Sequence, residues 1–186
     1  MKYDKVVELK DGNDCLLRSC NENDASAVLE IFNRTHEETD NLLTYAEENH
    51  FTVESEAAFL DEKNQSENAV EIGAFIDGNL VGFAGIDSIG DKLKIRHRAE
   101  FGVSVERAHW GKGVGKALTE ACIECAKKAG FSQLELEVLA ENENAVRLYQ
   151  SCGFKEYGRN PRGFRTKDGV YQPLLLMRLV LGHDHP

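Results

Sequence analysis

The chain has 186 residues, of which 41% are hydrophobic and 29% are charged, and its formal net charge at pH 7 is −10. This length and composition are typical of a globular protein with one substantial core, so we expect a single domain over residues 1–186. The excess of carboxylates argues against a general nucleic-acid binder, because such binding depends on neutralising phosphates with lysine and arginine.

Membrane, disulfide and metal-binding roles also lack support in the sequence. No apolar run approaches the ~20 residues of a membrane span, and the first residues lack a signal-peptide core, so we expect a cytoplasmic protein that does not bind membranes. The five cysteines are an odd number without framework spacing, which indicates reduced thiols. Cys122 and Cys125 form a C-x-x-C inside a helical pattern and have no second pair, so we expect both in the core and no metal site.

Turn and capping residues divide the first half of the chain into short strands and helices. Asp-Gly pairs favour hairpin turns, and aspartate and threonine favour the first position of a helix. The expected elements are two strands around the Asp11-Gly12 turn, a helix from about Asp24, a polar irregular segment over residues 35–51, a helix from Thr52 to about Glu62, and a hairpin of strands 70–76 and 80–86.

A further strand is predicted from Lys92. Its alternate residues from Lys92 to Arg98 are basic, and the residues between them are mostly apolar. We interpret the basic residues as a solvated strand face, with a binding role as the alternative. His97 falls on the apolar side, which favours a core histidine over a catalytic one.

The second half of the chain alternates strands and helices. The expected elements are a glycine-rich loop over residues 109–118, a helix from Val114 that is ended by Gly130, a strand from Leu134 to Val138, a capped helix within residues 141–154 that stops at Gly153, and two closing strands around residues 165–181. A glycine-rich loop between a strand and a helix, within mixed elements, predicts an α/β layered sheet.

The glycine-rich loop, HWGKGVGKAL, places three glycines at alternate positions just before a helix. Glycine permits positive φ and a close backbone approach, and a helix N-terminus directs N–H groups toward an anion, so we interpret the loop as a phosphate cradle. It is not a Walker loop, because Trp110 occupies the first glycine position and Ala117 replaces the required Ser or Thr. A dinucleotide fingerprint fails as well, since Lys116 occupies its third glycine position.

This loop and a later segment together resemble the acetyl-CoA-binding core of the GNAT superfamily of N-acetyltransferases. The loop is similar to the family pattern Q/R-x-x-G-x-G/A, with Gly113 and Gly115 at the small positions and Trp110 in place of Gln or Arg, as in the ribosomal-protein and amino-acid acetyltransferase branch. The pattern N-x-x-A-x-x-x-Y-x-x-x-G-F is met by Asn142, Ala145, Tyr149, Gly153 and Phe154. The resemblance covers about residues 97–181, and it implies a mixed, mostly antiparallel central sheet flanked by helices on both faces.

The resemblance implies that the protein binds acetyl-CoA and does not bind a metal ion. The pantetheine arm would add to the strand that ends at Val103–Val105, and the pyrophosphate would lie on the loop, where Lys112 and Lys116 supply positive charge. Packing against the strand end is the alternative role for Trp110. The implied cofactor-binding residues are Val103, Ser104, Val105, Trp110, Gly111, Lys112, Gly113, Val114, Gly115, Lys116, Asn142 and Tyr149.

Acetylation of an amine makes three chemical demands. The amine is mostly protonated at neutral pH, so a group must accept a proton. The oxyanion needs a donor, for which we expect a backbone N–H near Val103–Val105. The departing thiolate needs a proton or a hydrogen bond, and the resemblance assigns this role to the phenol of Tyr149, whose alternative role is to pack its helix against the sheet.

Two glutamates are candidates for the general base. The resemblance to ribosomal-protein alanine acetyltransferases indicates Glu137, five residues before Asn142, whereas other family members indicate Glu100 on the strand before the loop. Glu135 and Glu137 both lie on the polar side of an alternating strand, where a solvated carboxylate is the ordinary expectation. A chain of water molecules without a single base is the third alternative.

These residues predict an N-acetyltransferase that moves the acetyl group of acetyl-CoA directly to a primary amine within a ternary complex. The acceptor is a small amine, an amino acid or a protein N-terminus, and a homodimer is left open. The alternatives are a non-catalytic acyl-CoA-binding or sensor module on the same fold, and a nucleotide-binding protein. An acidic cluster in the irregular segment predicts either an entrance for a cationic acceptor or a merely solvated loop; its members are Glu37, Glu38, Asp40, Glu47 and Glu48.

Overall fold

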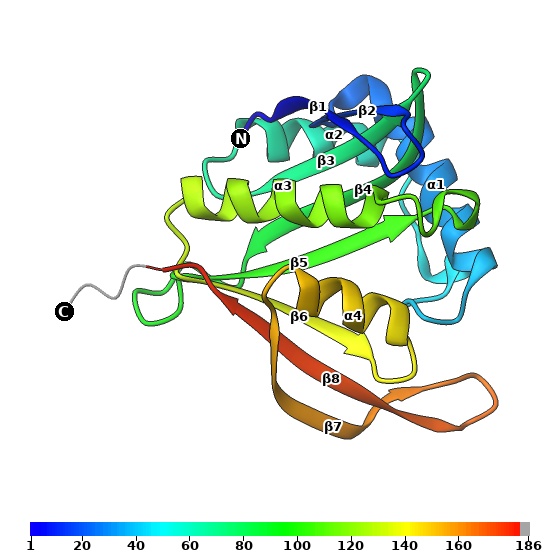
Figure 1. The fold of residues 1–186 in the computed structure, drawn as a ribbon, viewed down its shortest axis with the longest axis vertical. Coiled ribbons are helices and arrows are strands. Elements are labelled where there is room, and N and C mark those ends of the chain that lie inside the picture. The colour runs from blue at the N-terminus through cyan, green and yellow to red at the C-terminus, as the bar shows by residue number, and fades with distance from the viewer. Residues whose placement is uncertain (183–186) are drawn as a thin grey trace.

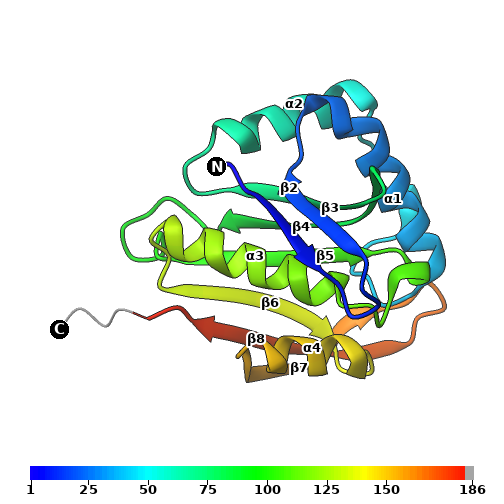
Figure 2. The ribbon, with the colours of Figure 1, turned by 45° about the horizontal axis from the view of Figure 1, so that its top comes forward.

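The computed structural model describes residues 1–182 as an eight-stranded sheet with helices on both faces (Figure 1, Figure 2). The strand order is β1-β2-β3-β4-β5-β6-β8-β7, and every neighbouring pair is antiparallel except β5 and β6. The strands are β1 (Asp4–Glu8), β2 (Asp14–Ser19), β3 (Val70–Ile76), β4 (Asn79–Ser88), β5 (Arg98–Val105), β6 (Gln133–Leu139), β7 (Lys155–Arg165) and β8 (Tyr171–Val180). This architecture confirms the predicted mixed, mostly antiparallel sheet.

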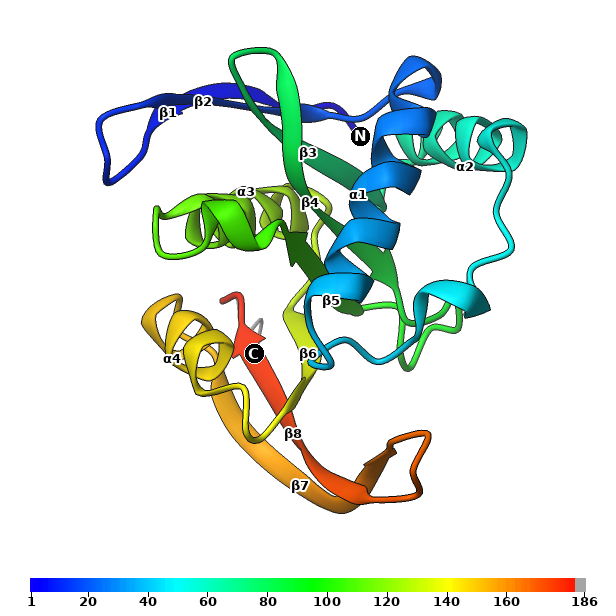
Figure 3. The ribbon, with the colours of Figure 1, turned by 90° about the vertical axis from the view of Figure 1, so that its right-hand side faces the viewer.

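Two helices cover each face of the sheet (Figure 3). On one face lie α1 (Ala25–Glu38) and α2 (Val53–Gln65), and on the other lie α3 (Val114–Lys128) and α4 (Glu143–Ser151). Because side chains alternate along each strand, the sheet contributes to two core clusters, a larger one that includes α3 and α4 and a smaller one under α1 and α2. On β3, for example, Ile72 and Ala74 join the larger cluster and Phe75 joins the smaller one.

Capping residues set the helix ends where the sequence predicts them. The side-chain oxygens of Thr52 and Asn142 each accept a hydrogen bond from the backbone N–H three residues later, at 3.3 and 3.2 Å, and so begin α2 and α4. Gly130 and Gly153 lie just beyond α3 and α4 with φ of 82° and 95°. A residue with a side chain rarely adopts this left-handed conformation, which explains the glycine at both helix ends.

Two predicted boundaries are wrong. The segment from Lys92 to His97 forms turns, and β5 starts only at Arg98. The reason is that β4 ends opposite the start of β5, so residues before Arg98 have no strand beside them. Leu93 is 77% exposed and His97 is exposed, so neither belongs to an apolar strand face. In addition, α1 continues to Glu38, so the irregular segment begins four residues later than expected.

The C-x-x-C pair contributes to the core, as the helical pattern predicts. Cys122 and Cys125 lie on the buried face of α3, and burial raises the pKa of both thiols. Within residues 1–182, no group of three or more side chains that could hold a metal ion is found. The helices of the same residues include none that is long and apolar enough to cross a membrane.

Candidate functional site

The sheet opens where β5 and β6 part. The two strands pair only between Arg98–Glu100 and Gln133–Glu135. Beyond this point β5 pairs with β4 alone and β6 pairs with β8 alone. The separation contributes to a cleft of about 1210 Å³, which is lined by residues of β4, β5, β6, α1, α4 and the glycine-rich loop.

The glycine-rich loop lines one end of this cleft. Gly111 and Gly113 have φ of 77° and 104°, and Gly113 caps the N-terminus of α3. The first N–H groups of a helix have no partners within it, and they carry the positive end of the helix dipole. Lys10 and Lys116 line the cleft beside the loop. This end of the cleft is therefore suited to an anion.

Trp110 joins the loop to the end of β5. Its indole N–H donates a hydrogen bond of 2.7 Å to the carbonyl of Val105, and the guanidinium of Arg107 lies 5.6 Å from the ring centroid. The residue is 44% exposed and lines the cleft. This hydrogen bond attaches the side chain of Trp110 to the end of β5, which is where the alternative packing role places it.

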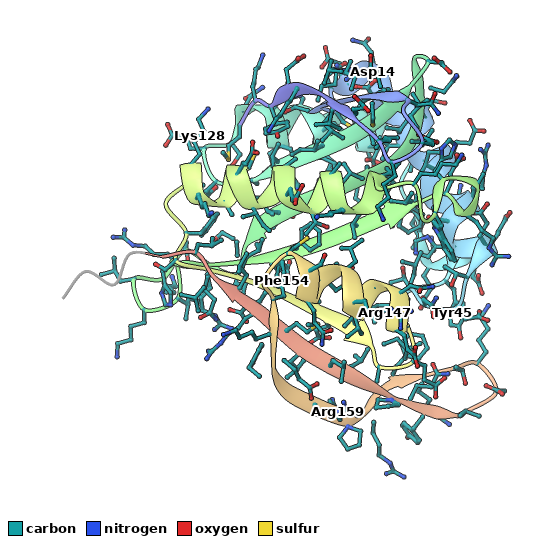
Figure 4. All side chains as sticks on the ribbon, in the orientation of Figure 1. Asp14, Tyr45, Lys128, Arg147, Phe154 and Arg159 are labelled. Atoms are coloured by element: carbon teal, nitrogen blue, oxygen red, sulfur yellow. The ribbon has the colours of Figure 1, made fainter. Side chains whose placement is uncertain are left out.

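Tyr149 belongs both to the core and to the cleft. It is 8% exposed, and its ring packs edge-on against Phe101 with the centroids 6.1 Å apart. Phe154, labelled near the middle of Figure 4, packs on the same two rings. Within residues 1–182 no hydrogen bond to the Tyr149 hydroxyl is formed, and the side chain lines the cleft. Burial raises the pKa of this phenol, so it carries its proton at neutral pH.

Three carboxylates lie side by side on the face of the sheet that α1 and α2 cover. The strand register places Asp87, Glu100 and Glu135 opposite one another on β4, β5 and β6. Glu135 is buried and accepts two hydrogen bonds from the guanidinium of Arg98, which lowers the pKa of Glu135. Asp87 is ion-paired with Lys63 of α2. Glu100, between them, is exposed in the cleft and has no ion-pair partner within residues 1–182.

A fourth carboxylate, Glu71 on β3, reaches the cleft across a glycine. A Cβ at Gly85 would lie 3.1 Å from the carboxyl carbon of Glu71, so a larger residue there would displace it. Gly85 pairs with Gly102 on β5, where a Cβ would meet nothing within 4 Å, so the cleft floor is open at this point. Although Lys63 lies 3.7 Å from Glu71, burial raises the pKa of this carboxyl to about 7.

The segment between α1 and α2 borders the cleft. The hydroxyl of Tyr45 accepts a 3.0 Å hydrogen bond from the N–H of Lys167, in the turn between β7 and β8, and the ammonium of Lys167 pairs with Glu47. We call Tyr45, Glu47 and Lys167 the clasp; Figure 4 shows Tyr45 above the β7–β8 turn. The residues of the segment that line the cleft are Thr39, Asn41, Leu42, Leu43 and Thr44.

The elements around this cleft match a known family. The family model described as the Acetyltransferase (GNAT) family matches residues 25–154, which is more than half of the chain and includes β4, β5, the loop, α3 and α4. The chain belongs to this family.

Curated relatives of this GNAT protein align with part of its chain. It is 31% identical over 113 residues to the ribosomal protein bS18-alanine N-acetyltransferase of Escherichia coli, covering 61% of this chain and 73% of that protein. It is 32% identical over 95 residues to the N-alpha-acetyltransferase RimI of Mycobacterium tuberculosis, covering 51% and 58%. It is 30% identical over 111 residues to the L-amino acid N-acetyltransferase AaaT of Escherichia coli, covering 59% and 67%. The aligned region spans only 28% of a longer relative from Mycobacterium leprae.

Solved structures share the fold of this GNAT protein over nearly its whole length. A GNAT acetyltransferase from Streptococcus pneumoniae superposes with a TM-score of 0.85 and 29% identity, covering 89% of this chain and 99% of that one. The putative acetyltransferase yncA of Salmonella typhimurium, solved with its cofactor acetyl-CoA, superposes with a TM-score of 0.80 and 24% identity, covering 91% and 96%. At that identity the second likeness concerns the fold alone.

Most of the residues singled out in the sequence line the cleft of this GNAT protein. Glu100 and Glu137 both line it and are exposed. The cofactor-binding candidates that line the cleft are Val103, Ser104, Val105, Trp110, Gly111, Gly113, Gly115, Lys116, Asn142 and Tyr149. Asn142 uses its amide oxygen to cap α4, so its NH₂ group is left for a ligand.

The expectation of a solvated Glu135 is wrong, because this carboxylate is buried and paired with Arg98. The side chain of Val114 is fully buried in the larger core cluster, so this residue offers a ligand only its backbone, as the resemblance implies. Lys112 is absent from the residues that line the cleft, whereas Lys10 and Lys116 are among them. The five acidic residues predicted for the irregular segment, all of them described, lie outside the lining of the cleft.

Sequence reasoning missed the carboxylates on β3 and β4 and the lysine on the β1–β2 turn. Glu71 and Asp87 alternate with the apolar residues of their strands. This pattern predicts that each lies on the polar face of its strand, but it does not predict that both line the same cleft. Lys10 lies about a hundred positions before the loop that it approaches. Only the strand order of the folded sheet brings these side chains to one site.

Proposed function

We propose that this protein transfers the acetyl group of acetyl-CoA directly to a primary amine. The observation that carries the proposal is the separation of β5 from β6, which forms a cleft lined by the glycine-rich loop and by the carboxylate of Glu100, which has no ion-pair partner within residues 1–182. Such a gap accepts an extended, amide-containing chain as an added strand. The loop accepts phosphates, and the carboxylates accept a proton from an amine.

The residues of the cleft fit acetyl-CoA. On the side from which β6 has parted, Val103–Val105 has no strand neighbour, so its backbone groups are available to the pantetheine amides. A Cβ at Gly111 would meet nothing within 4 Å, so the loop surface is open there. Lys116 supplies an ammonium beside the phosphates and Asn142 supplies a free NH₂ group. The bound cofactor supplies the thioester carbon that the amine attacks.

We assign the general base to Glu100 and keep Glu137 as the alternative. Glu100 lies on the strand that holds the thioester, three residues before Val103, and its carboxylate has no ion-pair partner in the described part of the chain. Glu137 lies on β6, across the gap and beside Leu176 of β8. A base must reach the amine directly or through one water molecule, and both carboxylates face the cleft.

Tyr149 is the group proposed to donate to the departing sulfur. Its hydroxyl is protonated and has no hydrogen-bond partner in the described chain, and its side chain lines the cleft. Backbone N–H groups of β5 near Val103 are proposed to stabilise the oxyanion. The proton thus leaves the amine for a glutamate, and the thiolate receives one from the phenol. The free donor on Tyr149 favours an enzyme over a non-catalytic acyl-CoA-binding module.

The acceptor is proposed to enter beside the clasp, where the segment between α1 and α2 lines the cleft. The names of the aligned relatives cover ribosomal proteins, protein N-termini and amino acids as acceptors. For this chain we propose a primary amine of one of three kinds, namely a small amine, an amino acid or a protein N-terminus. The cationic form of each would meet Asp87, Glu100 and Glu71 on the cleft wall.

Release of free thiol from acetyl-CoA, measured across a panel of amines, amino acids and N-terminal peptides, tests the proposed function. We expect amine-dependent release, and we expect Glu100→Gln to remove the ionisation of the base from the pH profile of kcat/KM. If Glu137→Gln abolishes that ionisation instead, the alternative base is correct. Failure of the protein to bind acetyl-CoA, or to release thiol with any acceptor class, would overturn the proposal.

A further inference from the structure

The turn between β1 and β2 rests on the glycine-rich loop. The backbone N–H of Lys10 donates a 3.0 Å hydrogen bond to the carbonyl of Lys112. The turn is closed by two more backbone hydrogen bonds, from Leu9 to Asn13 at 2.8 Å and from Gly12 to Leu9 at 3.0 Å. The backbone of Lys10 is therefore held beside the loop by a rigid turn.

The side chain of Lys10 follows the surface of the loop. Its Cγ lies 3.6 Å from the position that a Cβ on Gly113 would occupy. Lys10 lines the main cleft and also a neighbouring groove of about 260 Å³ between the β1–β2 hairpin and α3. Lys116 is the other lysine that lines both. The two ammonium groups thus belong to the same end of the cleft.

The charges of the two lysines are compensated differently. Lys116 lies 3.7 Å from Glu120, one turn further along α3. Lys10 has no ion-pair partner within residues 1–182. An exposed ammonium without a partner beside a helix N-terminus strengthens the local field for a phosphate.

We propose that Lys10 binds phosphoryl oxygens of coenzyme A. In this role it replaces Lys112, which the loop motif indicates as the source of positive charge. The inference rests on the proposed function, because it assumes that the loop holds the cofactor phosphates. The phosphates are the pyrophosphate on the loop or the 3′-phosphate of the ribose, which share this chemistry. Because the lysine is exposed, we expect its loss to weaken binding by about tenfold rather than to abolish it.

Calorimetric titration with CoA and with 3′-dephospho-CoA tests this assignment. Lys10→Met keeps the aliphatic stem on Gly113 and removes only the charge, Lys10→Arg keeps the charge, and Lys155→Met removes an exposed lysine on β7 as the matched control. We expect about tenfold weaker CoA binding in Lys10→Met, near-normal binding in the other two, and a smaller difference at high salt. Loss with both ligands identifies the pyrophosphate as the partner, and loss with CoA alone identifies the 3′-phosphate.

Two results would overturn the inference. One is a Kd for CoA in Lys10→Met equal to that of the wild type, and the other is an equal loss in Lys155→Met. Both leave the proposed function intact if the wild type binds CoA. Failure of the wild-type protein to bind either ligand would instead overturn the proposed function, so the two failures are distinguishable.

Discussion

The ring of Tyr149 packs against Phe101 and Phe154, and the same side chain lines the cleft. The two roles that the sequence leaves as alternatives are therefore compatible in one side chain. A substitution must separate the packing role of the ring from the donor role of the hydroxyl, because truncation to alanine would remove both roles at once. Phenylalanine removes the donor and keeps the ring.

Tyr149→Phe should lower kcat by about 10²-fold while the KM for acetyl-CoA changes little, because in the proposed mechanism the hydroxyl acts only as the thiolate departs. The midpoint of urea unfolding should stay close to that of the wild type, since the packed ring is unchanged. Steady-state kinetics with an identified acceptor gives the measurement. Wild-type kcat in the variant would leave Tyr149 with its packing role alone.

A substitution at Gly113 tests whether the glycine-rich loop binds acetyl-CoA. Its φ of 104° is a conformation that a β-branched residue rarely adopts, so Gly113→Val should distort the start of α3. We expect acetyl-CoA binding to weaken at least tenfold by calorimetry. Gly78→Val, in the β3–β4 turn, is the matched control, because Gly78 also has a positive φ, of 79°, has open space around it and lies outside the cleft lining. Unchanged affinity in a folded Gly113→Val protein would contradict the assignment of the loop.

Among the secondary-structure elements, α2 is joined to β3 and β4 by a buried ionic cluster. Lys63 of α2 is 5% exposed and contacts both Glu71 and Asp87. Glu56, also on α2, is buried, and burial raises the pKa of its carboxyl as it does for Glu71. Lys63 offsets only part of the cost of keeping these carboxylates ionised.

The pH dependence of stability should report this cluster. The folded-state pKa of Glu71 is raised from 4.5 to about 7, so the folded protein binds more protons than the unfolded chain between these values. Stability contributed by Glu71 is thus present below pH 4.5 and is lost as the pH rises to about 7, with an upper limit of about 3 kcal/mol. Glu71→Gln should therefore gain stability relative to the wild type between pH 5 and pH 8 in urea unfolding. Parallel pH profiles for the two proteins would show that Glu71 ionises normally.

The clasp connects the α1–α2 segment to the β7–β8 turn across more than a hundred residues of sequence. Its ion pair is exposed, with 61% of each side chain accessible, so the connection is weak. Lys167→Ala should speed backbone hydrogen exchange in residues 39–50 and change the KM of the acceptor, not that of acetyl-CoA. Lys155→Ala serves as the control. Equal exchange in both variants would show that the clasp does not order the segment.

Prediction from sequence succeeded where local physics decides the structure. Thr52, Asn142, Gly130 and Gly153 set helix ends through hydrogen bonds and backbone conformation that need no distant partner. It failed at residues 92–97, where an alternating pattern lacks a neighbouring strand to pair with. The same holds for the candidate site. The glycine-rich loop and α4 could be predicted because they carry recognisable motifs, whereas Glu71 and Lys10 could not, because only the order of the strands in the sheet brings them to the cleft.

The whole sheet consists of two parts, β1 to β5 and β6 with β8 and β7, joined by three residue pairs between β5 and β6. Elsewhere the two parts are held together by the larger core cluster, which includes residues of α3, α4 and both parts of the sheet. A ligand that lies between β5 and β6 contacts both. Binding of such a ligand should therefore raise the free energy of unfolding of both parts of the sheet together.

Acetyl-CoA at about a hundred times its Kd should stabilise the folded state by about 2.7 kcal/mol and raise the melting temperature by about 5–10 °C. Hydrogen exchange should slow most at residues 103–105, because the proposed binding mode gives their backbone N–H groups hydrogen-bond partners. The shift should be absent in Gly113→Val at the same concentration. A raised melting temperature without added protection on β5 would place the ligand elsewhere.

The narrow junction between β5 and β6 has an expected consequence for the lifetime of the protein in a cell. When the gap is empty, unpaired backbone lines both strands, and an opening there exposes extended chain of the kind that proteases bind. When the gap is filled, the same backbone is covered. Under the proposed function, the steady-state abundance of this enzyme would then rise and fall with the acetyl-CoA supply, so that a starved cell would degrade the catalyst along with losing its substrate.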